Sequence, residues 1–327
     1  MIAEGARATG HGLYDVAIVG GGAAGLSAAL VLGRARRRVV VVDSGAPRNG
    51  PAAHMQGFLS RDGMPPEELL AAGRAEVNRY CVELIEDRVD GIDAGFQVRL
   101  AGGRIIDARR ILIATGVRDE LPDIPGVRER WGRDLLHCPY CHGWEVRDQP
   151  IGVLGTRPDA VQHALLVRQW SEDVILFAHT LDLSPDELER LGARGVQVVQ
   201  GTVERLVIEG DRLTGVALVG GRVVPRAAVF IRPVNVPHGD GLLAGLDCDL
   251  DAAGFPLVDA TGRTSTPGVW AAGNVVDPRL QVITSAGAGS AAAIAINADL
   301  VQEDVRWAVD GRVATQGYDA SLVAIAG

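Results

Sequence analysis

The sequence predicts an α/β protein built from two domains of the dinucleotide-binding type. Two observations point to this fold class. A strand, a glycine-rich turn and a helix follow one another from residue 14, and a degenerate copy of the same plan starts at residue 150. The composition agrees, because 327 residues with 47% hydrophobic and 22% charged residues can form one large or two ordinary globular cores.

Charge and composition argue against several classes of function. The net charge of −9 and the pI near 5.3 disfavour nucleic acid or an anionic membrane as the main partner. All 32 basic residues are arginine, so lysine-based catalysis is excluded. Residues 1–12 do not have the charged and apolar regions of a signal peptide, and glycines interrupt the first apolar run at 16–32. We therefore expect a cytoplasmic protein with no nucleic-acid or membrane partner.

The first turn carries every part of a dinucleotide-binding motif. An apolar strand at 14–19 runs into Gly20-x-Gly22-x-x-Gly25, a helix follows at 26–34, and a second strand at 38–42 ends at Asp43. In this motif the glycines permit the tight turn, the approach of the backbone to a pyrophosphate and the close packing of helix on strand. An acid roughly 20 residues after the turn accepts a hydrogen bond from a ribose.

The stretch after Asp43 is predicted to complete the nucleotide site. The loop 44–57 contains Arg48 and His54 and would lie along the rest of the nucleotide. A helix is expected at 65–80, followed by a small antiparallel sheet of strands 82–85, 96–100 and 104–106. A buried strand at 110–115 then ends in the small residues Ala114, Thr115 and Gly116. Small residues suit a backbone that passes close to a bound cofactor.

The middle of the chain holds a Cys-x-x-Cys pair, Cys138 and Cys141, flanked by His137 and His142. Such a pair can close a small disulfide, and an imidazole can take a proton from a thiol or return it. The alternatives are half of a zinc site and an inert pair. Zinc needs four ligands, and no second Cys-x-x-Cys is present, so we predict a redox-active dithiol and no metal. The other two cysteines, Cys81 and Cys248, are expected to be buried and without a function.

A second strand-turn-helix unit occurs at 150–170, but its nucleotide motif is degenerate. Gly155 and Ala160 keep their small side chains, whereas Arg157 stands where the second glycine would admit a pyrophosphate. Pro158 removes a donor at the start of the helix. The next strand, 174–177, ends in residues 178–180, which offer neither an acid for a ribose nor an arginine for a 2′-phosphate. The sequence thus predicts a retained fold with a dismantled nucleotide site.

The rest of the chain completes the two domains. Short strands are expected at 196–203, 205–209, 215–219, 222–224 and 228–231, and residues 232–240 lead back out of the second domain. A turn and strand then lead to Gly273 and Asn274. The last helix is expected to begin near Ser285, and its many small residues suggest close packing against a cofactor or another helix.

Taken together, these motifs resemble the thioredoxin reductase family of two-domain flavoproteins. The resemblance rests on the first glycine motif with Asp43, residues 114–116, the Cys-x-x-Cys pair, residues 270–275 and residues 281–284. It implies two Rossmann-like, three-layer ββα domains, the second inserted into the first. It also implies a discontinuous FAD-binding domain of residues 1–118 and 245–327, a central redox domain of residues 119–244, and a homodimer.

The resemblance also implies roles for individual residues. Cys141 would lie against the flavin, and Cys138 would be the outer thiol that reacts with the substrate. The glycine motif would hold the pyrophosphate and Asp43 the adenosine ribose. The residues expected to bind FAD are Gly20, Gly22, Ala23, Ala24, Gly25, Asp43, Arg48, His54, Thr115, Gly116, Gly273, Asn274, Gln281, Val282 and Thr284.

Four departures from the family pattern refine the expected activity. His142 and Asn274 stand where acids are usual, Arg157 occupies the second turn, and residues 178–180 replace the basic 2′-phosphate pocket. These features resemble a subgroup of dithiol oxidases that form disulfides in natural products such as holomycin and gliotoxin. The expected function is an FAD-dependent oxidase of a small-molecule dithiol, with His137 or His142 as the base and O₂ as the acceptor, giving H₂O₂.

Two alternatives remain open. The first is a thioredoxin-disulfide reductase that receives electrons from NADPH or a ferredoxin-type donor and has a thioredoxin-like partner. The second is a flavin-binding protein without catalysis, and the intact Cys-x-x-Cys pair argues against it.

Overall fold

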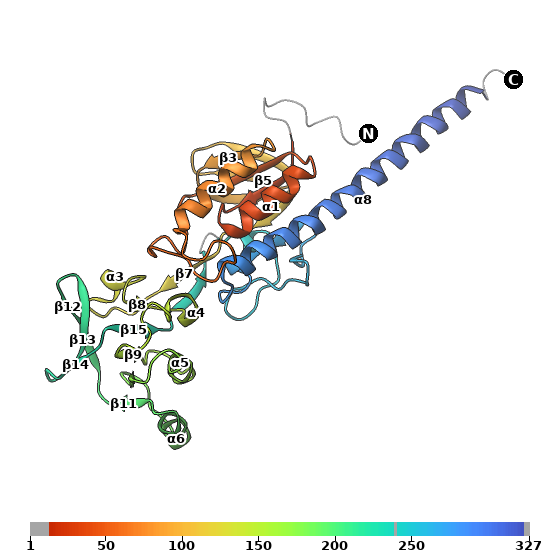
Figure 1. Ribbon diagram of the computed structural model, residues 1–327. Coiled ribbons are helices and arrows are strands. Elements are labelled where there is room, and N and C mark those ends of the chain that lie inside the picture. Colours follow the sequence, from red (N-terminus) through yellow and green to blue (C-terminus); the bar gives the residue numbers. More distant parts are fainter. Residues whose placement is uncertain (1–12, 239–240, 324–327) are drawn as a thin grey trace. The chain divides into compact units, whose positions relative to one another are not determined.

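The computed structural model describes residues 13–238 and 241–323, with side chains up to residue 311. Contacts within the chain divide it into two compact units (Figure 1). The first unit comprises Met1–Ala46, Leu70–Gly116 and Pro237–Gly327, and the second comprises Pro47–Leu69 and Val117–Val236. The domain boundaries expected at residues 118 and 245 stay a prediction, and contacts group the loop after residue 46 with the second unit.

The first unit is built on a parallel sheet with the strand order β3-β2-β1-β6-β17. The chain leaves β1 through a glycine turn into helix α1, and β2 follows in the parallel sense, as the sequence predicted. The elements are β1 (Tyr14–Val19), α1 (Ala23–Arg34), β2 (Val39–Asp43), α2 (Pro66–Asn78), β3 (Glu83–Glu86), β6 (Ile105–Ile113) and β17 (Val269–Ala271).

Alternating side chains of the parallel sheet build two cores, one on each face. Val16 and Ile18 of β1 pack with helices α1, α2 and α8, whereas Ala17 and Val19 pack against an antiparallel layer and helix α7. The unit therefore has three layers, helix–sheet–sheet. The antiparallel layer consists of β4 (Val89–Asp93), β5 (Gln97–Leu100) and the first residues of β6, and α7 is Leu242–Gly245.

The structure corrects the strand assignments of the first unit in two places. The strands expected at 104–106 and 110–115 form one continuous strand, β6. The strand expected at 82–85 does not belong to the antiparallel layer, because β3 pairs in parallel with β2 from Val40 to Asp43. Strands β2 and β3 are joined through helix α2, and such strand-helix-strand connections normally place the second strand parallel to the first. The third antiparallel strand is β4, which contains Gly91 between exposed acids and therefore has a weak strand signal.

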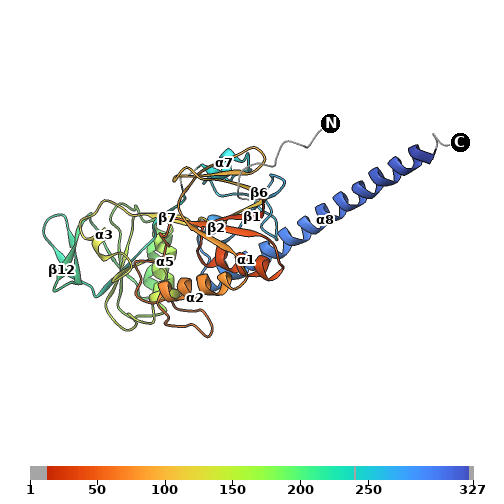
Figure 2. The ribbon, with the colours of Figure 1, turned by 90° about the horizontal axis from the view of Figure 1, so that it is seen from above.

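Helix α8 (Val282–Val323) begins beside α1 and continues past the sheet as a long straight helix (Figure 1, Figure 2). Its close contact with α1 depends on small residues, because a Cβ at Gly289 would overlap the carbonyl oxygen of Ala24. Further along, Arg109 of β6 pairs with Glu303 at 2.8 Å and with Asp15 at 2.7 Å, which ties α8 to the sheet. No described helix is long and apolar enough to cross a bilayer.

The second unit repeats the plan with a parallel sheet in the order β11-β10-β9-β15-β8. Val229 and Ile231 of β15 pack on the antiparallel layer, and Phe230 packs on the helices. The elements are β8 (Leu135–Leu136), β9 (Ile151–Leu154), α5 (Ala160–Val167), β10 (Val174–Phe177), α6 (Pro185–Ala193), β11 (Gln197–Val199), β12 (Val203–Glu209), β13 (Arg212–Leu218), β14 (Val223–Pro225) and β15 (Ala228–Ile231). The predicted fold class, two three-layer Rossmann-like domains, is confirmed.

Two paired strands connect the units along the chain. The expected connecting segment at 117–126 forms β7 (Val117–Glu120), and the return segment forms β16 (Val234–Pro237), which pairs with it. Asp119 of β7 accepts hydrogen bonds from Arg48 at 2.7 Å and from Asn235 of β16 at 2.6 Å. This carboxylate therefore joins three segments of the second unit.

The contact of α8 with α1 gives a test of the packing. Substituting Gly289 by Ala should lower the free energy of unfolding by about 2–3 kcal/mol, because the new methyl group collides with backbone rather than with a movable side chain. The matched control is Gly287→Ala on the same helix, where a Cβ meets nothing within 4 Å. That change should stabilise the helix by about 0.5–1 kcal/mol. Denaturant unfolding of both variants measures the difference, and equal stabilities would contradict the packing.

Candidate active site

In the first unit, the glycine turn at residues 20–25 follows the carboxyl end of β1 and enters helix α1. We call this turn, with the first residues of α1, the cradle. Gly20 has φ +105°, and a Cβ there would overlap the carbonyl oxygen of Ala114. A Cβ at Gly25 would overlap the carbonyl oxygen of Gly20, so helix α1 can approach the strand only without a side chain. Gly22 differs, because a Cβ built there meets no atom within 4 Å. The turn is thus tight on two sides and open at Gly22.

The open side faces the amino terminus of α1. Gly22 is the N-cap in an extended conformation, no side chain caps the helix, and the first turn holds no acid. The first amides of a helix need a partner, and the helix dipole favours an anion there. The first turn of α1, with Ala23 and Ala24, therefore fits a phosphate group, and this arrangement suits the pyrophosphate of a dinucleotide.

Asp43 ends β2 beside this turn. Its carboxyl carbon lies 2.8 Å from a Cβ built on Gly21, and its Oδ2 accepts a hydrogen bond from Arg74 Nη2 at 3.1 Å. The carboxylate is thus oriented next to the cradle, where it can accept from a ribose hydroxyl. Sequence reasoning missed Arg74, since one arginine on helix α2 carries no signal of a partner at the end of β2.

Other predicted cofactor residues of the first unit gather at the same cradle. A Cβ on Gly20 would lie 3.0 Å from the amide nitrogen of Thr115, and Gly116 adopts φ +72°. Gly273, with φ +84°, packs against α1, because a Cβ there would lie 2.9 Å from the Cβ of Ala24 and 3.9 Å from that of Ser285. The structure thus brings the segment after β6 and the segment after β17 together at the amino terminus of α1.

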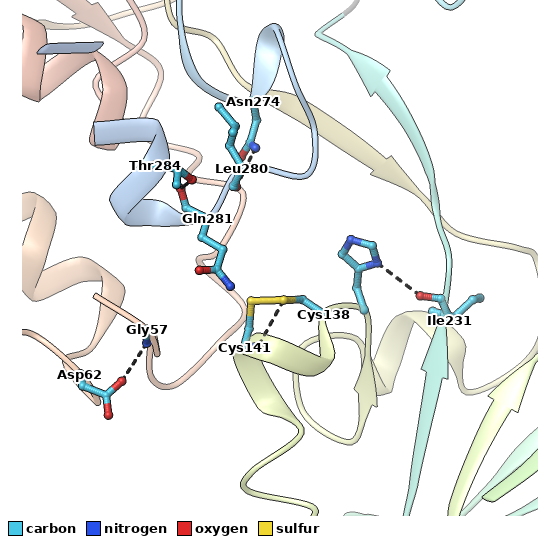
Figure 3. The surroundings of a disulfide bond; sticks show 10 residues. Gly57, Asp62, Cys138, Cys141, Ile231, Asn274, Leu280, Gln281 and Thr284 are labelled. Atoms are coloured by element: carbon cyan, nitrogen blue, oxygen red, sulfur yellow. Dashed lines mark hydrogen bonds between the residues drawn. A yellow bond between two sulfur atoms is a disulfide. The ribbon is translucent and has the colours of Figure 1, made fainter. Parts of the chain in front are cut away.

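Asn274 holds the loop that leads into helix α8. Its Nδ2 donates to the carbonyl oxygen of Leu280 at 2.9 Å (Figure 3). It also donates to the carbonyl oxygen of Asp277 at 3.0 Å. An aspartate at this position could not donate these bonds, which is the structural consequence of the asparagine. The backbone carbonyl of Gln281 accepts from Thr284 Oγ1 at 2.9 Å and from the amide of Ser285 at 2.8 Å. Helix α8 therefore starts at Val282, three residues before the expected start.

Two predicted cofactor residues belong to the second unit. Arg48 donates to both carboxylate oxygens of Asp119, at 2.9 and 2.7 Å. His54 is exposed, and its Nδ1 lies 3.1 Å from the carbonyl oxygen of Gly63. Their contact with a cofactor stays a prediction.

The redox pair lies at the carboxyl end of β8. Cys138 is the N-cap of the short helix α4 (Pro139–His142), and a disulfide joins it to Cys141 with a Cα–Cα distance of 5.2 Å (Figure 3). The amide of Cys141 donates to the sulfur of Cys138 at 3.1 Å. Pro139 fits the first helical position, where no amide hydrogen is needed. An amide that points at this sulfur would stabilise a thiolate on Cys138 once the disulfide opens.

His137 is positioned as an uncharged base. Burial lowers its pKa to about 4, with a further contribution from the Arg48 guanidinium and an opposing one from Asp119. Its Nδ1 lies 3.4 Å from the carbonyl oxygen of Ile231, which can only accept a hydrogen bond. The hydrogen therefore resides on Nδ1, and Nε2 keeps a lone pair. Such an imidazole is neutral at physiological pH and can receive a proton.

His142, at the end of α4, is the second histidine beside the pair. Burial lowers its pKa, and Glu145 opposes this shift. Burial thus favours the neutral imidazole in both histidines that are predicted to be acid/base groups. In the described part of the chain, no group of three or more His, Cys, Asp or Glu side chains is arranged to hold a metal ion.

Two exposed aromatic rings flank the disulfide. Tyr140, between the cysteines, is 64% exposed, and Trp144 is 66% exposed. Tyr140 meets the ring of Trp170 edge-on at 5.5 Å, and the guanidinium of Arg147 lies 4.0 Å from the ring of Trp144. A Cβ on Gly143 would lie 2.8 Å from Trp170, so the glycine lets this indole support α4. No motif in the sequence indicates that Trp170 belongs to the site.

Of the two cysteines outside the redox pair, one is buried and the other is exposed. Cys248 is buried, as expected, and its sulfur lies 3.5 Å from the hydroxyl of Thr264. Cys81 is exposed, which corrects the expectation that it is buried. It follows helix α2 in a turn with φ +59°, and the turn holds it at the surface.

In the degenerate second turn, the polar side chains after β10 make hydrogen bonds to neighbouring backbone groups of the protein. Thr180 Oγ1 lies 3.4 Å from the carbonyl oxygen of Gly155, and His179 Nδ1 accepts from the amide of Val203 at 2.9 Å. A Cβ at Gly155 would lie 2.6 Å from the carbonyl oxygen of Phe177, so this glycine remains necessary for the packing of the turn. The end of β10, where a nucleotide ribose would bind, is thus occupied by structural contacts.

Comparison with known proteins places this fold and these motifs in a family. Residues 14–290 match the pyridine nucleotide-disulphide oxidoreductase family. A probable thioredoxin reductase of Arthroderma benhamiae is 35% identical, but the match spans 54% of this chain and only 46% of that protein. The thioredoxin reductase tcpT of Claviceps purpurea is 32% identical over 80% of this chain and 86% of its own length.

Among solved structures, the crystal structure of HlmI is 60% identical, with a TM-score of 0.92 over 94% of this chain and 99% of that one. The chain therefore belongs to the pyridine nucleotide-disulphide oxidoreductase family and is a thioredoxin reductase-like member of it.

Proposed function

We propose that the protein is an FAD-dependent oxidase that converts a small-molecule dithiol to an intramolecular disulfide, with O₂ as the acceptor. The observation that carries the proposal is the combination of an intact Cys138–Cys141 pair with a second turn that lacks the features of a nicotinamide-nucleotide site. A reductase must receive electrons from a donor, and this turn offers no site for the usual one. An oxidase receives its electrons from the thiol substrate itself.

The first chemical step uses the Cys138 side of the disulfide. A substrate thiol loses its proton to the free Nε2 of His137, or to His142, and the resulting thiolate attacks the sulfur of Cys138. A bond forms between the substrate and Cys138 while the bond to Cys141 breaks, and Cys141 leaves as a thiolate.

The second step closes the product. The other substrate thiol, after deprotonation, attacks the substrate sulfur of the mixed disulfide and releases Cys138 as a thiolate. The amide of Cys141, which already points at that sulfur, stabilises the leaving group. The substrate has then lost two protons and two electrons, and the enzyme holds the reduced pair.

The cofactor would be held by the cradle of the first unit, with its pyrophosphate at the amino terminus of α1 and its ribose at Asp43. When bound, FAD supplies the route by which the two electrons pass from the reduced pair to O₂, giving H₂O₂. The proposal requires the redox pair to reach the flavin. A homodimer and a cytoplasmic location, both expected from the sequence, belong to the same proposal.

The second candidate is a disulfide reductase that uses NADPH or a ferredoxin-type donor. The observation that favours it is the family itself, since relatives such as tcpT are named thioredoxin reductases. Under this candidate the same cysteine pair would pass electrons outward to a thioredoxin-like protein.

An anaerobic titration separates the two candidates. The oxidised yellow protein is titrated with NADPH in one cuvette and with a small dithiol in another, while the flavin absorbance is followed. We expect bleaching by the dithiol alone, and recovery of the yellow colour with formation of peroxide when air is admitted. Prompt bleaching by NADPH would show that the protein is a reductase.

Substituting Cys138 by Ser should abolish turnover of the dithiol and leave FAD bound, because Cys138 belongs to the second unit and the cradle to the first. Turnover is measured as peroxide formation, and cofactor content as flavin absorbance after gel filtration. The control is Cys81→Ser, which removes an exposed free thiol and should keep full activity. A Cys138→Ser variant that still turns over would exclude the mixed disulfide.

Substituting His137 by Gln should change the pH profile as well as the rate. With a pKa of about 4, the neutral base is present above that pH and is lost only as the pH falls through 4. The wild type should therefore keep its kcat/KM well below pH 7. The variant should lose about 10²–10³-fold at pH 7 and regain rate toward pH 8.5, where a free thiol ionises unaided.

The control for this experiment is His238→Gln, which changes an exposed histidine in the segment after β16. Its profile should match that of the wild type. A His137→Gln variant with an unchanged profile would remove His137 from the reaction and leave His142 as the base.

A further inference from the structure

The second turn lies at the place where an open parallel sheet normally binds its ligand. In the second unit the chain runs from β9 to β10 and β11 on one side, whereas β15 and β8 lie on the other. The carboxyl ends of β9 and β15 therefore form the topological switch point, and ligands of such sheets bind in the crevice outside it. The residues that follow these two strands decide what this crevice can accept.

A single carboxylate occupies this position. Asp159 Oδ1 accepts a hydrogen bond from Arg157 Nε at 3.3 Å, and Asp159 Oδ2 accepts one from Arg232 Nε at 3.1 Å. Arg157 belongs to the turn after β9, and Arg232 directly follows β15. The carboxylate thus bridges the two sides of the switch point. We call these three residues the Asp159 bridge.

The position of Asp159 is unusual for a helix start. It is the N-cap of α5, yet its side chain makes no capping hydrogen bond. An aspartate at an N-cap normally accepts from the first amides of its own helix. Here the carboxylate is directed to the two guanidinium groups instead. It provides the negative charge that a nucleotide phosphate would bring to the same place.

A buried imidazole without a hydrogen-bond partner at Nε2 among the described residues lies on the helix that follows the bridge. His163 lies four residues after Asp159 on α5 and is only 4% exposed. Its Nε2 has no hydrogen-bond partner in the part of the chain that the structure describes. A buried polar atom without a partner is costly, and such atoms mark positions where a ligand or water completes the hydrogen bonding.

We propose that Asp159 determines the electron-donor specificity of this protein, because its carboxylate occupies the phosphate position of the second turn and neutralises the arginines that would otherwise bind an anion. This inference deepens the proposed function and rests on it, since an oxidase that accepts electrons from dithiols has no use for a nicotinamide nucleotide. The ligand class that Asp159 excludes is a pyrophosphate-containing dinucleotide.

The test is the binding of inorganic pyrophosphate and NADPH to the full-length holoprotein, measured by isothermal titration calorimetry. The variant Asp159→Asn keeps the size of the side chain and removes its charge, which leaves Arg157 and Arg232 without their shared counterion. We expect pyrophosphate to bind this variant at least about tenfold more tightly than the wild type. NADPH should follow in the same direction.

Two further variants make the test specific. Asp186→Asn neutralises an exposed aspartate on α6, outside the Asp159 bridge, and should bind pyrophosphate as weakly as the wild type does. The double variant Asp159→Asn/Arg232→Gln should lose the affinity gained by the single change. Because the three side chains of the bridge are partly exposed, the single change should alter stability little, and thermal unfolding verifies this.

The outcomes separate this inference from the proposed function. Equal pyrophosphate affinities in the wild type and in Asp159→Asn would overturn the role of Asp159 and leave the oxidase proposal intact. Rapid bleaching of the wild-type flavin by NADPH would overturn both. A gain of affinity that the Arg232→Gln change removes would support the bridge.

Discussion

The constraint on which the first unit depends is the close approach of backbone to backbone around the amino terminus of α1. At Gly20, Gly25 and Gly289 a single added methyl group would overlap a carbonyl oxygen, and at Gly273 it would press on the methyl of Ala24. These contacts bring β1, β6, the segment after β17 and helix α8 to one point. The helix end at that point has no side-chain cap, and its first amides suit the phosphate groups of a dinucleotide. Side chains at these positions would push the chain apart and remove the anion site together with the packing.

The second unit shows that the same fold can keep its packing without the complete glycine motif. Gly155 is still required, because a side chain there would collide with the carbonyls of β10. The position two residues later carries Arg157, whose side chain pairs with Asp159. A comparison of the two turns therefore distinguishes two roles of the glycines in the motif. One role is structural and is preserved in both units, whereas the other serves the ligand and is preserved only in the first.

The sequence predicted the fold class and most of the cradle because both depend on local patterns. Alternating apolar residues, glycine spacing and the acid after β2 are visible within a few dozen residues. It could not predict pairings that only the tertiary fold creates. Strand β3 was placed in the wrong layer, since four residues cannot reveal their neighbours. The partners of Asp43, His137 and Asp159 are Arg74, Ile231 and Arg232, each distant in sequence and carried by an element without a motif. The exposed position of Cys81 depends on a turn that composition does not encode.

Arg232 connects the dismantled nucleotide site to the chemistry of the thiols. It pairs with Asp159, and its charge also contributes to lowering the pKa of His137 and of His163. A dinucleotide bound at the switch point would bring several negative charges close to this arginine and would favour protonated imidazoles. Asp159 places only one negative charge beside Arg232, and the pKa of His137 remains low. If His137 takes a proton from a thiol, the neutral form is the one that the reaction needs. Burial is the main cause of the low pKa of His137, and Arg232 adds to it, so this arginine takes part both in the ion pair with Asp159 and in keeping the base neutral.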